Sequence, residues 1–225
     1  MRVTVCSVGV GAHYGEQLDK LDRSLDDVGF TGERLLARDH LPKCCPSHAS
    51  VPYGFKPYML RLAQHDRADI VIWADAACVA VRPLDSLVRY IEEHGVYFHG
   101  PDHSTGMWTN DRVLEHFGMP RDDAMSIPMI LAGTMGLDLR NQRARYFLSR
   151  WYRAAESGLF SGFHTNERGT ESKDPRCLGH RHDQSVASLL IHELRLPMTQ
   201  RFFRFANDFS GEPTFVAVGW GQVFP

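Results

Sequence analysis

The chain has 225 residues, and its 25 basic and 27 acidic side chains leave a formal net charge of −2. Hydrophobic residues make up 43% of the chain and charged residues 23%, which are ordinary values for a globular domain. This composition excludes a disordered tail, a collagen-like repeat and a bundle of membrane-spanning helices. The balanced charge also excludes a protein that coats nucleic acid with a strongly basic surface, although it leaves room for a local basic patch.

The cysteines and the amino end of the chain indicate its compartment. The 5 cysteines are odd in number and irregularly spaced, and no Cys-x-x-Cys pair occurs, which argues against a disulfide framework and a structural zinc site. Residues 1–8 read as a strand rather than a signal sequence, and no apolar stretch is long enough to span a bilayer. We therefore expect a reduced, cytoplasmic protein without a membrane span. Its 12 histidines are unusually many.

In the first half of the chain, short apolar runs alternate with helical periodicity, a pattern typical of α/β proteins. The predicted strands cover residues 3–8, 34–37, 69–73, 79–81 and 96–98. The predicted helices cover residues 16–25, 55–65 and 85–93. The run at 69–73 is almost continuously apolar, as expected for a central parallel strand that is buried on both faces.

The second half contains two polar regions and two strong helices. Residues 99–128 read as long loops around one short helix at 111–117, and residues 157–182 are polar and rich in glycine. Apolar residues 129–131 lead into a predicted turn at 132–136, after which a strand resumes at 137–139. The remaining predictions are helices at 141–156 and 184–194 and a strand at 215–218. The first of these helices has an apolar side that we expect to contain Tyr146, Phe147, Trp151 and Tyr152.

The segment that follows the first strand is typical of a nucleotide-binding sheet. Gly9 and Gly11 connect the apolar run to the helix, although their spacing does not match the dinucleotide fingerprint G-x-G-x-x-G. In open α/β sheets, ligands bind beyond the carboxyl ends of the strands. The candidate ligand segments are therefore residues 9–14, 74–78 and the turn at 132–136.

Asp75 is the first candidate for a functional residue. It follows a buried strand and precedes small residues, and an unpaired buried carboxylate costs several kcal/mol. The alternative is a turn or capping aspartate that accepts hydrogen bonds from backbone amides. Lys56, at the start of a predicted helix, is mildly unfavourable there unless an anion lies nearby. Its alternative is an ordinary solvated lysine.

Three segments together resemble a known family. Residues 72–78, preceded by Phe55-Lys56-Pro57-Tyr58, look like the strand-end acidic motif of GT-A nucleotide-sugar glycosyltransferases. They are similar, more narrowly, to bacterial and phage members with a Lys-Pro-Tyr…Asp-small-small-Cys pattern. Residues 130–137 resemble the acceptor-side strand and turn of that family, and residues 180–185 (His-Arg-His-Asp-Gln-Ser) resemble its late Asp-Gln motif. The likeness runs in order over residues 3–195 and leaves residues 99–128 unmatched.

The resemblance implies a fold and an activity. The fold would be α/β, with a GT-A (Rossmann-like) mixed, mostly parallel sheet between helices in three α/β/α layers. One domain would span residues 1–225, with a nucleotide-binding half at about 1–100 and an acceptor-side half at about 101–225. The activity would be transfer of a sugar from a nucleotide-diphosphate donor, such as a UDP-sugar, to an acceptor hydroxyl. The acceptor could be a glycan, a protein, a small molecule or a modified DNA base.

The resemblance also implies roles for individual residues. The catalytic residues would be Asp75 and Asp183; Asp183 could orient the sugar or act as a base, or it could merely cap the helix that follows it. The residues expected to bind the donor are Val8, Gly9, Val10, His13, Tyr14, Lys56, Asp75 and Ala76. The residues expected to bind the acceptor are Trp108, Gly133, Thr134, His182 and Gln184.

The chain departs from the family at its metal motif. The usual motif is Asp-x-Asp, whereas here Ala77 stands at the second acidic position. A Mn²⁺ or Mg²⁺ ion could bind through Asp75, the diphosphate and a distant His or Asp. Alternatively, basic residues could neutralise the diphosphate without a metal; the available ones are Lys56, Arg2, Arg82 and Arg181.

Two other classes of function remain open at this stage. Ala77 also suits a non-catalytic domain that binds a nucleotide or sugar on the same fold, because fold does not determine function. A metal hydrolase that uses the histidines is the third alternative. Nucleic acid is a possible acceptor, but the balanced charge does not indicate it.

Overall fold

The computed structural model describes residues 1–206, 211 and 213–218. Its centre is a five-stranded sheet in the order β2-β1-β3-β6-β5. The strands are β1 (Val3–Val8), β2 (Glu33–Ala37), β3 (Ile70–Ala74), β5 (Val96–His99) and β6 (Leu131–Asp138). β1 pairs in parallel with β2 and β3, and β6 is antiparallel to both β3 and β5. Only β6 therefore runs against the direction of the other four strands, which confirms a mixed, mostly parallel sheet. The central strand β3 is parallel to β1 on one side and antiparallel to β6 on the other.

The predicted turn at residues 132–136 is wrong, because β6 runs through it without interruption. Of the residues that indicated a turn, Gly136 serves close packing instead. A Cβ atom on Gly136 would lie 2.3 Å from Cδ1 of Ile91, so a larger residue here would force the Ile91 side chain of helix α3 (Asp85–His94) to move. Small residues in a strand can mark a close approach of this kind as well as a turn.

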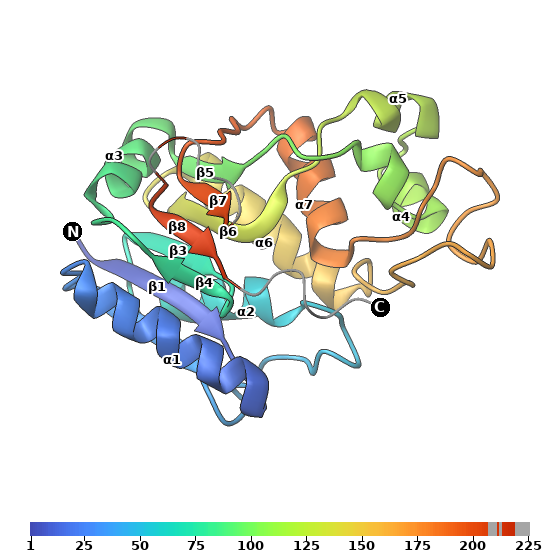
Figure 1. Cartoon of the computed structure of the whole chain (residues 1–225). Helices are drawn as coiled ribbons and strands as arrows, with labels where there is room; N and C mark the ends of the chain where they lie inside the picture. The colour runs from blue at the N-terminus through green and yellow to red at the C-terminus, as the bar shows by residue number, and fades with distance from the viewer. Residues whose placement is uncertain (207–210, 212, 219–225) are drawn as a thin grey trace.

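Helices cover both faces of the central sheet, as Figure 1 shows, which confirms the three-layer arrangement. Side chains along β3 alternate between the two faces. Ile70 and Ile72 pack with α1 (Ala12–Asp27) and α3. Val71 and Trp73 belong to the larger cluster on the opposite face, beneath the helices α2 (Phe55–His65), α6 (Gln142–Glu156) and α7 (His182–Glu193).

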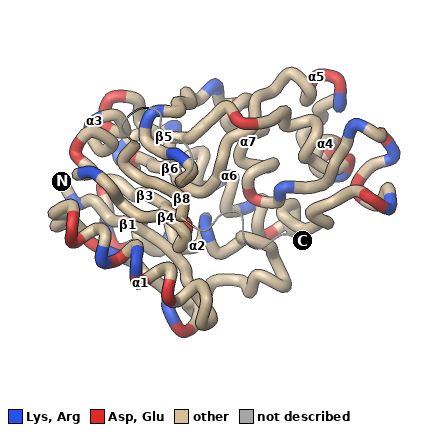
Figure 2. The backbone as a smooth tube through the Cα atoms, viewed as in Figure 1, with Lys and Arg blue, Asp and Glu red and all other residues tan. Residues whose placement is uncertain are grey.

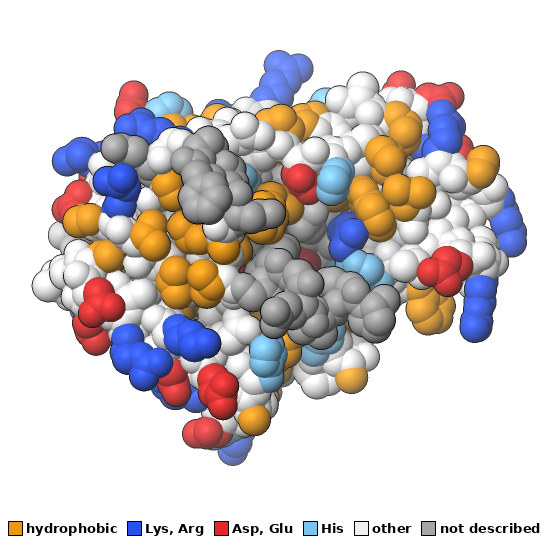
Figure 3. All heavy atoms as spheres, viewed as in Figure 1, with side chains coloured by type: hydrophobic (Ala, Val, Ile, Leu, Met, Phe, Trp, Pro, Cys, Tyr) orange, Lys and Arg blue, Asp and Glu red, His pale blue; other side chains and the backbone are white. Residues whose placement is uncertain are grey.

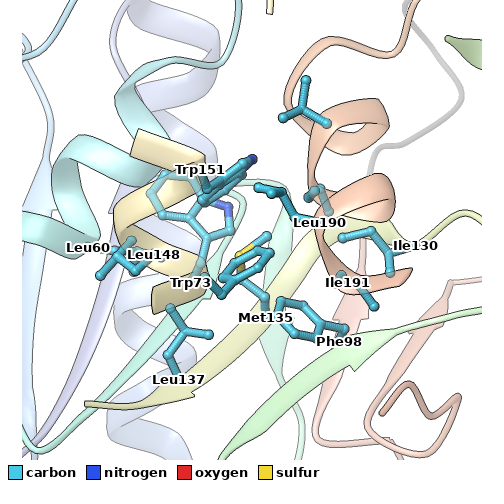
Figure 4. Packing of buried hydrophobic residues seen from close by; sticks show 14 of the residues in the cluster. Leu60, Trp73, Phe98, Ile130, Met135, Leu137, Leu148, Trp151, Leu190 and Ile191 are labelled. Carbon is cyan, nitrogen blue, oxygen red and sulfur yellow. The ribbon is translucent and has the colours of Figure 1, made fainter. Parts of the chain in front are cut away.

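The larger cluster holds the helices of the second face in place. In Figure 4, Trp151 of α6 and Leu190 of α7 lie over Trp73 and Met135 of the sheet. All four side chains are at most 1% exposed. Burial of side chains of this size stabilises the fold by roughly 1.5–3 kcal/mol each. The positions of α2 and α7 relative to the end of β3 are therefore set by a closely packed core.

A second, three-stranded sheet lies on the α1 and α3 side, in the order β4-β8-β7. Its strands are β4 (Cys78–Ala80), β7 (Phe203–Phe205) and β8 (Phe215–Ala217). The predictions at residues 79–81 and 215–218 are confirmed, whereas β7 was missed because three residues are too few to show a period. Ser24 of α1 ties the layers together, since its Oγ accepts a hydrogen bond of 2.9 Å from the Ala80 amide.

Residues 99–128 contain more helix than the sequence indicated. Besides α4 (Asp111–His116) there is a 3₁₀ turn, η1 (Thr105–Trp108), and a second helix, α5 (Arg121–Ser126). The expectation of one short helix is therefore wrong. Asp122 and Asp123 in the first turn of α5 favour a helix start, because negative charge is stabilised at that end of the helix dipole.

Helix α6 begins where expected but turns a different side inward. Asn141 caps it by accepting hydrogen bonds from the amides of Arg143 (2.8 Å) and Ala144 (3.4 Å). Tyr146 was expected on the apolar side but is 52% exposed, whereas Phe147 and Trp151 are fully buried. The buried stripe follows the spacing of three and four residues that places side chains on one helix face.

Charged residues are spread over the whole molecule. Figure 2 shows basic and acidic residues interspersed along α1 and over the loops, with neither sign dominating. Within residues 1–206, 211 and 213–218, no helix is long and apolar enough to cross a membrane.

Candidate active site

Three charged side chains from separate elements meet at the carboxyl end of β3. Asp75 follows the last residue of β3, Lys56 comes from the first turn of α2, and Asp183 comes from the first turn of α7. Nζ of Lys56 lies 3.0 Å from Oδ1 of Asp75 and 3.3 Å from Oδ2 of Asp183. We call this group the charged triad. Its place agrees with the edge at which ligands bind in open α/β sheets.

Lys56 is enclosed at the centre of the charged triad. It is 3% exposed, so the alternative of a solvated lysine is wrong. Its ammonium donates a hydrogen bond of 2.9 Å to the carbonyl of Ala132 and lies 5.2 Å and 5.6 Å from the ring centroids of Tyr53 and Trp73. Burial alone lowers the pKa of Lys56, but the two carboxylates outweigh burial and raise it, so the ammonium stays charged.

Asp75 is the most exposed member of the charged triad, with 19% of its side chain accessible. Its Oδ1 accepts a hydrogen bond of 2.7 Å from the indole Nε1 of Trp73 in addition to the contact with Lys56. Its own amide donates to the carbonyl of Gly133 at 2.8 Å. The partners of the carboxylate are thus side chains, which distinguishes Asp75 from a turn aspartate that serves backbone amides.

Asp183 is buried and does not cap its helix. The N-cap residue of α7 is Arg181, and no side-chain hydrogen bond caps the helix. Burial raises the pKa of Asp183 to about 6; the charge of Asp75 adds to this effect, and Lys56 opposes it. Oδ2 of Asp183 forms an ion pair with Nζ of Lys56 at 3.3 Å but has no hydrogen-bond partner among the described residues. A buried acceptor without a donor is costly, so this oxygen is suited to a hydroxyl supplied by a ligand.

Aromatic and imidazole rings line one side of the charged triad. Tyr53 lies 4.7 Å from His48 and 5.6 Å from His182, measured between ring centroids. His182 lies 6.1 Å from His164, which in turn is 6.4 Å from Trp108. We call these five residues the ring wall. Figure 3 shows histidine side chains gathered near the middle of one face of the molecule. Part of the high histidine content is thus gathered around one site.

The surroundings of the ring-wall histidines favour the neutral imidazole. Burial is the main cause that lowers the pKa of His48, His164 and His182, and it brings the pKa of His164 to about 4. Neighbouring positive charges add to the effect, from Lys56 at His48 and from Arg181 at His164. A neutral imidazole has one donor and one acceptor nitrogen, which suits hydroxyl groups better than phosphates.

Two residues of the late Asp-Gln motif have unusual settings. His182 has a φ of 51°, in the left-handed region that non-glycine residues rarely adopt, and its Nδ1 donates to the carbonyl of Phe160 at 2.8 Å. Strained backbone of this kind tends to occur at functional sites. The guanidinium of Arg181 lies 4.0 Å from the ring centroid of Trp108 and contacts Nε2 of His164. Burial lowers the pKa of Arg181, and within the described chain its guanidinium forms no ion pair with a carboxylate.

The segment after β1 lies at the same edge of the sheet. Gly9 is buried and donates its amide to the carbonyl of Ala37 at 2.9 Å, whereas Val10, His13 and Tyr14 are exposed. The ring of Tyr14 packs edge-on against that of His13, with 5.2 Å between the ring centroids. The remaining predicted donor residues are partly or fully buried beside this edge: Val8 and Ala76.

The predicted acceptor residues are only partly brought together. Gly133 contacts Asp75 through its carbonyl, and Oε1 of Gln184 accepts a hydrogen bond of 3.5 Å from the Ala132 amide. Trp108 and His182 belong to the ring wall. Thr134 points to the other face of the sheet, where its fully buried hydroxyl lies 3.1 Å from the hydroxyl of Tyr97.

Two residues that contact the site, Trp73 and His164, were not predicted from the sequence. Trp73 stands two residues before Asp75, so the period of a strand could have placed both on one face. His164 lies in an irregular loop, where no periodic pattern could have predicted its position.

Two of the basic residues expected near the diphosphate lie away from the charged triad. Arg2 lies at the opposite end of β1, where it pairs with Glu33 at 3.3 Å. Arg82 follows β4 of the second sheet.

With Lys56 in place, the residues present do not form a site for a divalent metal. In the part of the chain that the structure describes, no group of three His, Cys, Asp or Glu residues could hold such an ion. Oδ1 of Asp75 already has two donors, Asp183 faces Lys56, and Ala77 offers no ligand. Mg²⁺ and Mn²⁺ need several oxygen ligands in a regular arrangement.

Comparison with known proteins identifies the fold. No family model matches the chain, and no curated protein matches its sequence. Among solved structures, one similar protein is a glycosyltransferase involved in the glycosylation of the major capsid of PBCV-1, with a TM-score of 0.58 and 10% identity over 96% of this chain and 92% of that chain. Another is the bifunctional glycosyltransferase WbbM in its apo form, with a TM-score of 0.52 and 10% identity over 97% of this chain and 45% of that chain. The chain thus shares the fold of these two glycosyltransferases, as the resemblance of its sequence implied.

Proposed function

We propose that this chain transfers a sugar from a nucleotide-diphosphate sugar to a hydroxyl group of an acceptor. The observation that carries the proposal is the buried carboxylate of Asp183, whose Oδ2 lacks a hydrogen-bond partner among the described residues. It lies beside Lys56 and Asp75 at the ligand-binding edge of the sheet. The shared fold with glycosyltransferases supports the same conclusion.

The donor nucleoside would lie between the segment after β1 and Asp75. The exposed part of the Asp75 carboxylate is an acceptor that suits ribose hydroxyls, whereas it would repel phosphate oxygens. Tyr14 offers an exposed ring for the base. Donor contacts were predicted in this segment for Val8, Gly9, Val10, His13 and Tyr14, and this role stays a prediction.

Arg181 is the residue best suited to the diphosphate. Lys56 is enclosed between two carboxylates, so its charge is already compensated. Arg181 has its guanidinium stacked on the face of Trp108 and forms no ion pair with a carboxylate within the described chain. A guanidinium binds phosphate oxygens in a bidentate manner, and stacking limits its freedom before the ligand arrives.

Asp183 would act as the general base. The acceptor oxygen attacks the anomeric carbon, its proton moves to the Asp183 carboxylate, and the anomeric C–O bond breaks with its electron pair leaving on the nucleoside diphosphate. A carboxyl group whose pKa is raised to about 6 is still ionised at pH 7 and is a stronger base than an ordinary aspartate. The acceptor that fits the ring wall is a carbohydrate, because neutral imidazoles and ring faces suit an uncharged polyol.

Release of UDP from UDP-sugars, with and without simple sugars as acceptors, tests the proposal. We expect Asp183→Asn to lower turnover by about 10²–10⁴, the range of general base catalysis, and to change the Kd for UDP only slightly. Asp138→Asn is the matched control, since Asp138 is also a buried, ion-paired carboxylate but lies at the far end of β6. Turnover near the wild-type value in Asp183→Asn would contradict the base role. UDP binding by the wild type without any turnover would identify a non-catalytic binding domain.

A further inference from the structure

We propose that the ammonium of Lys56 is a built-in cation that takes the place of a divalent metal in this site. Donor binding in this protein is then independent of Mn²⁺ and Mg²⁺. The claim that the donor binds without a metal rests on the proposed function, whereas the claim that the wild-type site binds no divalent ion does not. The two can therefore fail separately.

The surroundings of Nζ are those of a bound cation. Three oxygens lie around it, from Ala132 at 2.9 Å, Asp75 at 3.0 Å and Asp183 at 3.3 Å. The rings of Tyr53 and Trp73 present their faces within 6 Å, a second kind of contact that cations favour. Carboxylate and carbonyl oxygens are also the ligands that Mg²⁺ and Mn²⁺ prefer. The ammonium thus occupies an oxygen cage made of two carboxylates and one carbonyl.

The ammonium of Lys56 cannot leave the site without moving helix α2. Its side chain is 4% exposed and extends from the first turn of α2, which is anchored in the core by Met59 and Leu60. A metal that displaced the ammonium would leave a second positive charge buried beside it. A divalent ion therefore cannot enter between the two carboxylates while Lys56 is in place.

The substitution at the metal motif agrees with this arrangement. With Ala77 in place of a second acidic residue, Asp75 and Asp183 are the two carboxylates of the cage, and one ammonium already offsets one of their charges. Removal of the lysine charge would leave two buried carboxylates and the Ala132 carbonyl without a cation. That set of oxygens should then bind a divalent ion.

The test is to replace Lys56 by methionine, which keeps most of the side-chain volume, and to titrate Mn²⁺. We expect the wild type to bind no Mn²⁺ in calorimetry and to keep its Tm as Mn²⁺ is added. Lys56→Met should have a lower Tm that rises with Mn²⁺ concentration, because an ion that binds only the folded state stabilises it by mass action. The double variant Lys56→Met/Asp183→Asn should lose this response, which assigns the new site to the cage.

The wild type alone provides a second measurement that does not depend on the folding of the variant. The Kd for UDP should be the same within about twofold in Mn²⁺ and in EDTA, a difference below 0.5 kcal/mol. A tenfold loss of UDP affinity in EDTA, or a Mn²⁺-dependent rise in the wild-type Tm that Asp75→Asn abolishes, would overturn the built-in cation. If UDP binds under neither condition, the donor proposal fails while the Mn²⁺ titrations still decide the role of Lys56.

Discussion

Asp183 shows how much of the proposed chemistry depends on the surroundings of a single residue. Its carboxyl group is buried between the helix that carries it and the sheet, and burial raises its pKa to about 6. The protonated form is therefore favoured by folding, so the contribution of this group to stability is complete below about pH 4. That contribution is lost as the pH rises through about 6. At neutral pH Asp183 is in the ionised form that the reaction needs, and this ionisation lowers the free energy of unfolding.

The pH profile of the reaction follows from this residue. We expect kcat/KM to fall about tenfold for each pH unit below about 6, because a protonated Asp183 cannot accept the proton of the acceptor hydroxyl. Measurement of UDP release between pH 4.5 and pH 8 checks the expectation, with stability followed in parallel to exclude unfolding. A profile that stays flat to pH 4.5 would remove Asp183 from the chemistry.

Arg181 makes a separate prediction about donor affinity. Arg181→Gln should weaken UDP binding about 10- to 100-fold, which corresponds to about 1.5–3 kcal/mol for a hydrogen bond to a charged group. Arg61→Gln is the matched control, because Arg61 also stacks on an aromatic ring, with its guanidinium 4.7 Å from the ring centroid of Tyr152. Calorimetry with UDP separates the two variants, and equal affinities would show that Arg181 does not bind the diphosphate.

At the scale of secondary structure, the connection between β1 and α1 determines where the ligand edge lies. Gly9 has no room for a side chain, since an added Cβ would lie 2.4 Å from the Tyr14 carbonyl oxygen and 2.6 Å from Cβ of Leu18. The close contact brings the start of α1 against the end of β1. The exposed segment at residues 10–14 is thereby held beside the charged triad.

A pair of glycine variants tests this packing. Gly9→Ala should lower the free energy of unfolding by about 1–3 kcal/mol, the usual cost of overpacking. Gly15→Ala should raise it by up to about 1 kcal/mol, because its Cβ would lie 3.6 Å from the Gly9 carbonyl oxygen and alanine is the better helix former. Urea denaturation compares the two, and an equal loss of stability in both would contradict the steric argument.

The same elements show what could be predicted from sequence. The strands at 3–8 and 69–73 and the helices at 55–65 and 141–156 were recognised because their apolar periods are long and uninterrupted. Asp75 was singled out because it ends such a strand. The meeting of Lys56 with Asp183 could not be foreseen, because 127 positions separate them and only the packing of α2 and α7 on one core brings them together. Gly136 misled the prediction because its role depends on Ile91.

At the scale of the whole molecule, buried histidines couple folding to pH. Burial lowers the pKa of His99 to about 4 and that of His180 to about 3. The unfolded chain binds protons at these residues below about pH 6.5, whereas the folded chain does not. Their contribution to stability is therefore complete above about pH 6.5 and is lost as the pH falls toward 4.

Acid unfolding should reflect this coupling. Each such histidine adds up to about 1.4 kcal/mol per pH unit to the fall in stability below pH 6.5. His99→Phe should reduce the slope, because it removes one titrating group while keeping the ring contact with Phe203, whose centroid lies 5.0 Å away. The exposed His65 provides the control through His65→Gln. Urea denaturation from pH 4 to pH 8 gives the slopes, and identical slopes for wild type and His99→Phe would contradict the expectation.

The reversed direction of β6 has one further consequence. Because this strand enters the sheet beside Asp75, Ala132 and Gly133 support the charged triad with main-chain atoms: one carbonyl accepts from Lys56 and the other from the Asp75 amide. The residue type at these two positions can therefore change between related proteins while the two main-chain carbonyls keep their contacts with Lys56 and Asp75. Deletion of one residue from β6 would instead shift both carbonyls out of line with β3, so related chains should vary here in residue type and stay constant in strand length.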